Sequence, residues 1–303
     1  MHADGQVLRA AYIHNIIRFS DMDRLHENLG YDVVATLGEG ARSTIYAVKD
    51  RRGQLYALKH VVKEKAKDQR FLDQAILEHK VASQLNHPSL RRCYKMIRQR
   101  QLLRVVEVFV LMEMVDGVTL EHQRPTDLIQ MCQICGKIAD GLESMHEGGY
   151  VHADIKPNNI IVTDDWSVKI IDFGQSCQIG TVKQRIQGTP DYIAPEQVRR
   201  KAITPRTDVF NLGATMYWLL TGSHITTMIP KGIGGGEQTE PEPTAPPIQV
   251  RPDVPAALSA LVMQCIETTV NDRPDSMARV RDRLDLAIGQ LVRRASPPPA
   301  EAV

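Results

Sequence analysis

The sequence predicts an α+β protein, in which a small antiparallel β-rich part with one main helix precedes a larger, mainly α-helical part. Between residues 32 and 59, three short β-forming segments alternate with tight turns, which is typical of an antiparallel meander. Residues 208–220 are apolar almost all round, as in a buried central helix. A second helix is indicated by apolar residues at spacings of 3, 4, 4 and 3, namely Met131, Ile134, Ile138, Leu142 and Met145.

Composition excludes several classes of protein. The chain has 303 residues and a net charge of +1, so no global electrostatic field indicates nucleic acid or a membrane surface as a partner. Five scattered cysteines argue against a disulfide framework and fit a reducing compartment. No apolar run approaches the length of a membrane span, and the N-terminus lacks the features of a signal peptide. We therefore expect a cytoplasmic protein without a membrane span.

We expect four regions along the chain: an N-terminal helical extension (1–30), a small lobe (31–115), a large lobe (116–295) and a tail (296–303). The extension is loosely helical, and its pattern leaves open whether it packs on the domain surface or serves as a dimerising or partner-binding helix. Residues 229–255 contain seven prolines and a glycine run, and we expect a flexible loop without regular structure there.

In the small lobe we expect strands at 32–37, 44–48, 55–59 and 105–112, and a helix at 68–85. Gly38 and Gly40 lie between two hairpin strands, so they do not form a dinucleotide fingerprint, which requires a helix next. Without Cβ atoms, however, this backbone can approach phosphate groups closely. Lys59 on the third strand and Glu78 on the helix are expected to form a pair that holds the lysine ammonium in place.

A central stretch, residues 150–174, gathers the groups that phosphoryl transfer needs. Asp154 and Asp172 lie 18 residues apart, and Lys156 and Asn159 lie between them at the ends of two short β-rich runs. A base, a cation and two metal-coordinating oxygens can thus surround one point. Transfer of a phosphoryl group from a metal-bound nucleotide is the chemistry that requires all four.

Together these motifs make the chain resemble a eukaryotic-type Ser/Thr protein kinase domain, most closely the bacterial Hanks-type kinases. The resemblance runs from about residue 31 to 291 and implies a bilobal fold with an ATP cleft between the lobes. It rests on Gly38-x-Gly40-x-x-Ser43, Ala57-Leu-Lys59, Glu78, Met112-Glu-Met-Val-Asp-Gly, His152-x-Asp154-x-Lys156-x-x-Asn159, Asp172-Phe-Gly174, Ala194-Pro-Glu196, Asp208 and Arg273.

The resemblance implies a role for each of these residues. Asp154 would accept the proton of the substrate hydroxyl, Lys156 would neutralise the transferred phosphoryl group, and Lys59, held by Glu78, would bind the α/β-phosphates. Asn159 and Asp172 would hold Mg²⁺, with Mn²⁺ as an alternative. The remaining ATP contacts would come from Gly38, Gly40, Ser43, Ile45, Ala57, Met112, Glu113, Met114, Asp116 and Ile161. Thr189, Glu196 and Arg273 would shape the segment that receives Ser/Thr-containing protein substrates.

Three features depart from the family pattern. Ala153 stands where many members have an arginine that binds a phosphate on the activation segment, so we expect activity without phosphorylation of Ser176 or Thr181. Ser43 replaces a third glycine, and we expect nucleotide binding to survive this change. Residues 229–255 replace a short helix that the family uses for docking, so that surface is either lost or remodelled.

The expected function is ATP-dependent phosphorylation of Ser/Thr hydroxyls in proteins, including autophosphorylation. The alternatives are a pseudokinase-like scaffold and a small-molecule phosphotransferase, although the residues whose loss marks a pseudokinase are all present. Cys132 and Cys135 form a C-x-x-C without a second cysteine pair, so we expect packed helix residues there and no zinc site.

Overall fold

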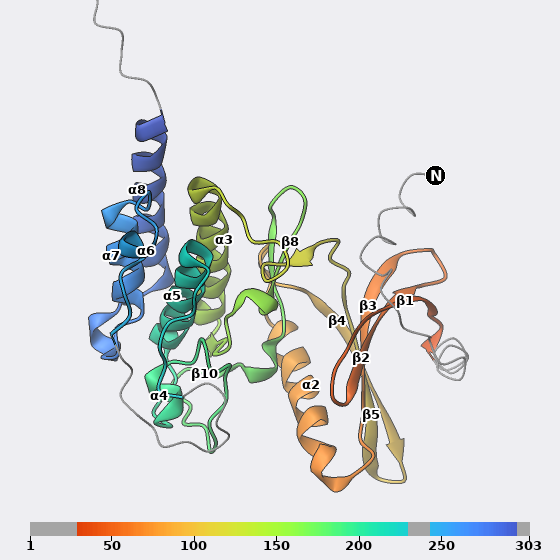
Figure 1. Ribbon diagram of the computed structural model, residues 1–303. Coiled ribbons are helices and arrows are strands. Elements are labelled where there is room, and N and C mark those ends of the chain that lie inside the picture. Colours follow the sequence, from red (N-terminus) through yellow and green to blue (C-terminus); the bar gives the residue numbers. More distant parts are fainter. Residues whose placement is uncertain (1–28, 230–242, 296–303) are drawn as a thin grey trace, which may run out of the picture. The chain divides into compact units, whose positions relative to one another are not determined.

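Figure 1 shows the computed structural model, which describes residues 29–229 and 243–295. The chain divides into two compact units. Within the described residues, the first unit comprises 29–86, 90–118 and 172–174, and the second comprises 87–89, 119–171, 175–229 and 243–295. Each unit thus includes a short segment that lies apart in the sequence from the rest of that unit. The α+β fold class predicted above is confirmed.

The first unit is built on a five-stranded antiparallel sheet with the order β1-β2-β3-β5-β4. The predicted meander of the first three strands is confirmed, with every neighbouring pair antiparallel. The strands are β1 (Asp32–Glu39), β2 (Ser43–Lys49), β3 (Leu55–Val62), β4 (Cys93–Gln101) and β5 (Arg104–Glu113). A turn of 3₁₀ helix, η1 (Ala66–Asp68), leads into α2 (Gln69–Ala82), the main helix of this unit.

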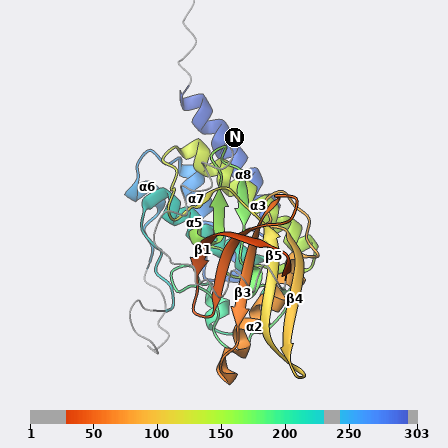
Figure 2. The same ribbon diagram turned by 90° about the vertical axis from the view of Figure 1, so that its right-hand side faces the viewer.

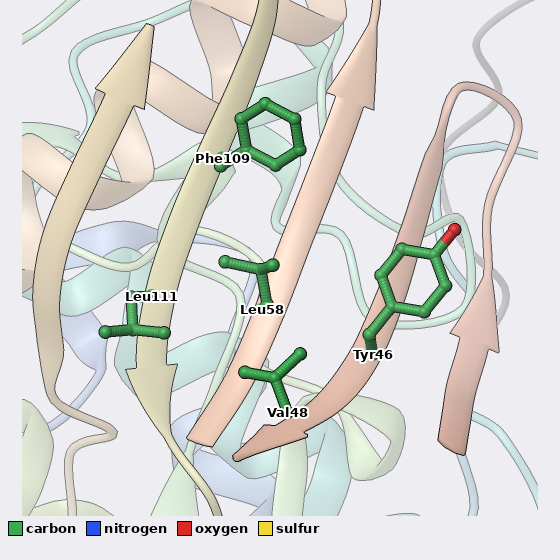
Figure 3. Packing of buried hydrophobic residues seen from close by; sticks show 5 residues of the cluster. All are labelled: Tyr46, Val48, Leu58, Phe109 and Leu111. Carbon is green, nitrogen blue, oxygen red and sulfur yellow. The ribbon is translucent and has the colours of Figure 1, made fainter. Parts of the chain in front are cut away.

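Side-chain alternation gives the sheet two different faces. Lys59 points to α2, where it meets Glu78, so its neighbour Leu58 lies on the opposite face. On that face a hydrophobic cluster joins β2, β3 and β5 (Figure 3), and it consists of Tyr46, Val48, Leu58, Phe109 and Leu111. On the helix side, Leu72, Ala75 and Val81 of α2 are buried. The lysine is therefore held between a packed sheet and a packed helix.

Strand β4 was not predicted from the sequence. Its residues (CYKMIRQRQ) are rich in arginine, lysine and glutamine, which have little intrinsic preference for strands. Eight of its nine residues are exposed or half-buried, and within the described residues this edge strand pairs only with β5. Pairing with a strongly β-forming neighbour, which local sequence does not reveal, determines this strand.

The second unit is mainly helical. α5 (Pro205–Thr221) is buried along almost its whole length, as predicted, and α3 packs against both α5 and α8. Asp127 caps α3, since its Oδ1 accepts a hydrogen bond from the Gln130 backbone N–H at 2.8 Å. The helices are α3 (Leu128–Glu147), α4 (Pro195–Val198), α5, α6 (Pro247–Val250), α7 (Ala256–Cys265) and α8 (Met277–Ala295), with the 3₁₀ turns η2 (Pro157–Asn159), η3 (Phe173–Gln175) and η4 (Val270–Asp272).

Short strands frame the central stretch. β8 (Ile160–Val162) and β9 (Val168–Ile170) form the predicted hairpin, and β7 (Tyr150–Val151) pairs with β10 (Cys177–Gln178). β6 (Val118–Thr119) lies where the chain passes from the first unit to the second. Cys132 and Cys135 are buried on α3, as expected of packed helix residues.

The prediction that residues 229–255 lack regular structure is wrong for part of this stretch. Residues 247–250 form α6, which begins with Pro247. Proline is favoured in the first turn of a helix because its φ is preset and its missing N–H would have no intrahelical partner there. The extension at 1–28, the dimer or partner helix proposed for it, residues 230–242 and the tail lie outside the described residues. Within the described part, no helix is long and apolar enough to cross a membrane.

Candidate active site

In the first unit, the predicted pair of Lys59 and Glu78 is formed. The Lys59 Nζ donates a hydrogen bond to Glu78 Oε2 at 2.6 Å, and the carboxylate is fully buried. Arg91 approaches the other carboxylate oxygen at 3.5 Å. Glu78 therefore has a cation on each side, which offsets the cost of burying its charge.

The charge of Lys59 is stabilised by two carboxylates. Burial by itself would lower the pKa of Lys59, but Glu78 and Asp172 outweigh this effect, so the pKa lies above its ordinary value. Lys59 is thus protonated over the physiological pH range. Asp172 itself has a left-handed backbone (φ 63°), an uncommon conformation for a residue other than glycine that is often found at functional sites.

The loop between β1 and β2 brings glycine backbone into a tight turn. The Gly40 N–H donates to the Ser43 carbonyl at 2.7 Å, and a Cβ on Gly40 would lie 2.8 Å from the Ser43 hydroxyl oxygen. Arg42, at the tip of this loop, forms ion pairs with Glu64 at 2.6 Å and Asp68 at 3.3 Å. The serine in place of a third glycine is therefore compatible with the hairpin.

The other residues expected to contact ATP lie on strands of their own units or just after β5. Ile45 and Ala57 lie on β2 and β3 and face cross-strand partners, and Met112 is fully buried on β5. Glu113 ends β5, Met114 follows it and Asp116 is exposed. In the second unit, Ile161 is half-buried on β8.

In the second unit, Asp154 accepts hydrogen bonds from three side chains. Its Oδ1 accepts from the Thr189 hydroxyl at 2.9 Å, and its Oδ2 accepts from Lys156 Nζ at 3.0 Å and Asn159 Nδ2 at 3.2 Å. Lys156 Nζ also donates to the Thr189 hydroxyl at 2.6 Å. A buried carboxylate, a lysine and a threonine from the distant 175–196 segment thus form a closed triangle.

The loop that carries Asp154 is fixed from behind by Asp208 of α5. Asp208 Oδ2 accepts from His146 Nε2 at 2.8 Å and from the His152 backbone N–H at 2.9 Å, and Oδ1 accepts from the Ala153 N–H at 2.7 Å. Burial would raise the pKa of Asp208, but these partners outweigh it and hold the pKa below the ordinary value. The ionised carboxylate therefore fixes the loop backbone.

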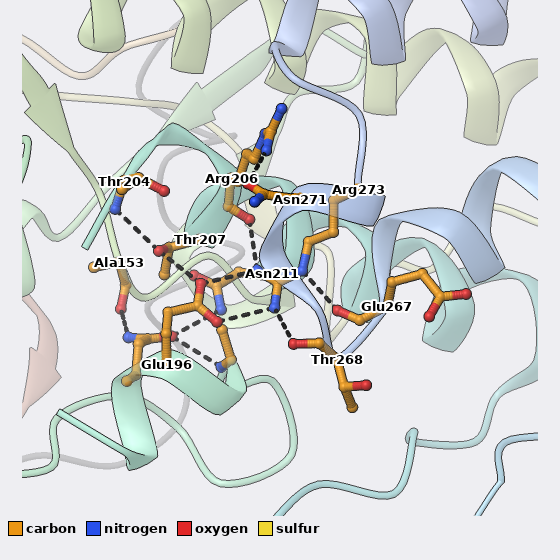
Figure 4. Close-up of polar contacts among 12 residues, drawn as sticks. Ala153, Glu196, Thr204, Arg206, Thr207, Asn211, Glu267, Thr268, Asn271 and Arg273 are labelled. Carbon is orange, nitrogen blue, oxygen red and sulfur yellow. Dashed lines mark hydrogen bonds and ion pairs between the residues drawn. The ribbon is translucent and has the colours of Figure 1, made fainter. Parts of the chain in front are cut away.

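A second buried network holds the segment that ends at α4 (Figure 4). Arg273 forms a two-pronged ion pair with Glu196, with N–O distances of 2.8 and 2.9 Å, as predicted. Arg273 also donates to the carbonyls of Glu267, Arg206 and Thr268. The Thr207 hydroxyl donates to Glu196 at 2.8 Å. Every charge in this network is buried and paired, so it has a structural role rather than a chemical one.

Comparison with known proteins agrees with this geometry, since the chain matches the protein kinase domain over residues 31–283. The chain belongs to the protein kinase domain family. PknL, a serine/threonine-protein kinase of Mycobacterium tuberculosis (strain ATCC 25618 / H37Rv), is 33% identical over 201 residues, which cover 63% of this chain and 49% of PknL.

Two further relatives of this kinase domain carry the same class of name. The serine/threonine-protein kinase PknB of Mycolicibacterium smegmatis is 28% identical over 267 residues, covering 83% of this chain and 42% of PknB. Serine/threonine-protein kinase A of Synechocystis sp. is 27% identical over 276 residues, covering 82% of this chain and 51% of that protein. The chain thus spans about half the length of the relatives that it matches.

Ala153 of this kinase domain lies in an apolar setting. It is fully buried and packs with Val151, Ile203 and Cys177, and its backbone is left-handed (φ 61°). The Gln197 Nε2 donates to its carbonyl at 2.8 Å. A methyl group fits this cluster, whereas a long cationic side chain would have to leave it.

Sequence reasoning missed several residues that support the site. It gave no role to His146, Gln197 or Thr207, which hold Asp208, the Ala153 carbonyl and Glu196, respectively. Residues of these types are common on helices, and no local signal in the sequence indicated their supporting roles. Their functions follow from partners that lie 62, 44 and 11 residues away.

Proposed function

We propose that this kinase domain transfers the γ-phosphoryl group of ATP to Ser and Thr hydroxyls of proteins. The triangle of Asp154, Lys156 and Thr189 is the observation that carries this proposal. It places an aliphatic hydroxyl, that of Thr189, at 2.9 Å from Asp154 Oδ1. This contact supports the idea that the carboxylate can accept a proton from an alcohol, as a general base must.

Each unit contributes residues with a distinct task. In the second unit, Asp154 accepts the substrate proton, and Lys156 lies at 3.0 Å from it as a positive charge for the phosphoryl oxygens. In the first unit, Lys59, held by Glu78, binds the phosphates, and the backbone of Gly38 and Gly40 covers them. We also propose that this domain makes the base and ribose contacts that the resemblance implies.

Asn159 and Asp172 are proposed as the ligands of a divalent ion, Mg²⁺ or alternatively Mn²⁺. Asn159 Nδ2 donates to the carbonyl and the carboxylate of Asp154, at 2.8 and 3.2 Å. Because both acceptors are oxygens, the amide must present its NH₂ group to them. Its Oδ1 accepts no hydrogen bond within the described residues and suits a hard cation. When bound, the ion neutralises phosphate charge.

We propose that activity does not require phosphorylation of the 175–196 segment. β10 pairs with β7, Lys183 Nζ donates to the Gln175 carbonyl at 2.5 Å, and the Gly180 N–H donates to the Ile203 carbonyl at 2.8 Å. These contacts support a segment that is ordered without a phosphate. Ser176 is also buried, with 1% of its surface exposed. The double variant Ser176→Ala/Thr181→Ala should keep most of its activity, and near-complete loss would contradict this proposal.

We also propose that the lobes span residues 31–115 and 116–295, that the kinase domain phosphorylates itself and that it is cytoplasmic. The last is supported by five cysteines that are all free.

One assay tests the function. The chain is incubated with Mg²⁺ and labelled ATP, with and without a generic protein substrate, beside Asp154→Asn and Lys59→Met. We expect label on Ser and Thr that both variants lose. ATP binding without transfer to protein would favour a scaffold, and transfer only to small molecules would favour a phosphotransferase of another class.

A further inference from the structure

The turn between β4 and β5 has an unusual composition. Leu102 and Leu103 occupy the two turn positions between the paired residues Gln101 and Arg104, and they are 95% and 91% exposed. Such high exposure means that no side chain of the described residues covers them, so the tip protrudes from the sheet. Single exposed leucines are common, but two adjacent ones at the end of a hairpin form a convex apolar tip.

The backbone of this turn does not explain the choice of leucine. Leu102 is left-handed (φ 55°), a conformation that glycine and asparagine adopt at lower cost than a bulky apolar residue. Leucine at this position adds both backbone strain and solvent-exposed apolar surface. Neither stabilises the isolated domain, which indicates that the side chains serve an interaction.

Exposed cations lie on the β4–β5 hairpin and on the segment that follows β3. β3 ends on the side of the sheet that faces the β4–β5 turn. There Val62 pairs with Glu107, and the Lys63 N–H donates to the Val106 carbonyl at 2.9 Å. Figures 1 and 2 both place the first turn of α2 at the same end of the unit as the β4–β5 turn. The exposed cations of this region are Lys65, Lys67, Arg70, Arg98, Arg100 and Arg104.

Acidic residues do not neutralise this cluster. Glu64 and Asp68 are both paired with Arg42, at 2.6 and 3.3 Å. Within the described part of the chain, no carboxylate forms an ion pair with Arg98, Arg100 or Arg104. The net charge of the whole chain is only +1, so this concentration of positive charge is local.

We propose that the β4–β5 turn is a peripheral membrane-contact site for anionic lipid, with Leu102 and Leu103 entering the hydrocarbon and the nearby cations of the hairpin and of the segment after β3 binding headgroup phosphates. A convex apolar tip with cations behind it on the same end of the sheet matches the layers of a bilayer surface, with hydrocarbon beneath anionic headgroups. An acidic protein partner would satisfy the cations, but it would need a groove to cover the tip. The site contacts the membrane without spanning it.

Vesicle flotation of the 303-residue chain tests the proposal. We expect binding to vesicles of phosphatidylcholine and phosphatidylglycerol, little binding to phosphatidylcholine alone, and weaker binding as salt screens the charges. In Leu102→Asn/Leu103→Ser, binding should fall by about tenfold or more, because two apolar side chains no longer enter the hydrocarbon. In Arg100→Gln/Arg104→Gln it should fall by about 25-fold, roughly fivefold for each charge.

A matched control lies at the opposite end of the same sheet. Arg51 and Arg52 are exposed in the β2–β3 turn, and Arg51→Gln/Arg52→Gln removes the same charge there. This control should bind vesicles like the wild type. Asparagine suits the left-handed backbone at Leu102, so thermal melting should show that the leucine variant stays folded.

Three results would overturn the proposal. The first is no binding of the wild type to anionic vesicles at low salt, even if it binds soluble polyglutamate. The second is unchanged binding by the folded leucine variant. The third is an equal loss in the Arg51/Arg52 control, which would indicate a general electrostatic attraction.

Discussion

The buried ion pair between Glu196 and Arg273 allows a quantitative prediction about stability. The two side chains are 4% and 0% exposed, and Arg273 donates to both carboxylate oxygens and to three carbonyls. In Arg273→Met, Glu196 keeps the Thr207 hydroxyl as a side-chain partner but loses its only salt bridge within the described residues. Removing one partner from such a pair costs about 3–5 kcal/mol, because the other charge stays buried without compensation.

Urea denaturation followed by tryptophan fluorescence measures this change. Both tryptophans of the chain, Trp166 and Trp218, belong to the second unit, so their emission reports on the unit that holds the ion pair. The matched control is Arg279→Met. Arg279 is 71% exposed and pairs with Asp275 at 3.7 Å, so its loss should change the free energy of unfolding by no more than about 0.5 kcal/mol.

The double variant Glu196→Leu/Arg273→Met tests whether the two side chains contribute to stability as an ion pair or independently of each other. Because it leaves no unpaired charge, it should be more stable than Arg273→Met alone. The reasoning would be refuted if Arg273→Met cost less than about 1 kcal/mol, or if the double variant lost the sum of both single effects.

Three further predictions concern the residues proposed for catalysis and their support. Lys59→Met should lower kcat by about 10²–10³-fold without unfolding the chain, measured by steady-state kinetics beside circular dichroism, and a change below tenfold would be inconsistent with its role. Thr189→Val should lower kcat/KM for protein substrates by about tenfold or more, because it removes hydrogen bonds to two charged groups, whereas Thr189→Ser should recover most of the activity. Asp208→Asn should destabilise the second unit at neutral pH. The folded pKa of Asp208 lies below the ordinary 3.8, so its contribution to the free energy of unfolding is present above that value and is lost as the pH falls through the folded pKa. The free energies of unfolding of wild type and variant should therefore converge in acid. A difference that stays constant with pH would contradict the assignment.

Elements with local signals were predictable from the sequence alone. The meander of the first unit, the amphipathic α3 and the buried α5 followed from turn residues and hydrophobic period. The pairs Lys59–Glu78 and Glu196–Arg273 also followed, because the motifs that contain them have characteristic residue types and spacing. The meander, α3 and α5 are set by the backbone geometry of single elements, which a short stretch of sequence records, whereas the two pairs join separate elements and were predicted from the motifs of the kinase family.

Features that depend on distant partners became apparent only in the folded chain. β4 has little intrinsic strand preference and exists because β5 offers it a ladder of hydrogen bonds. Asp208 holds the loop that carries Asp154 through residues about 55 positions away, and the basic region near Leu102 and Leu103 gathers segments from two parts of the chain. Contacts of this kind depend on how the packed chain brings separate segments together, and no local pattern in the sequence records that arrangement.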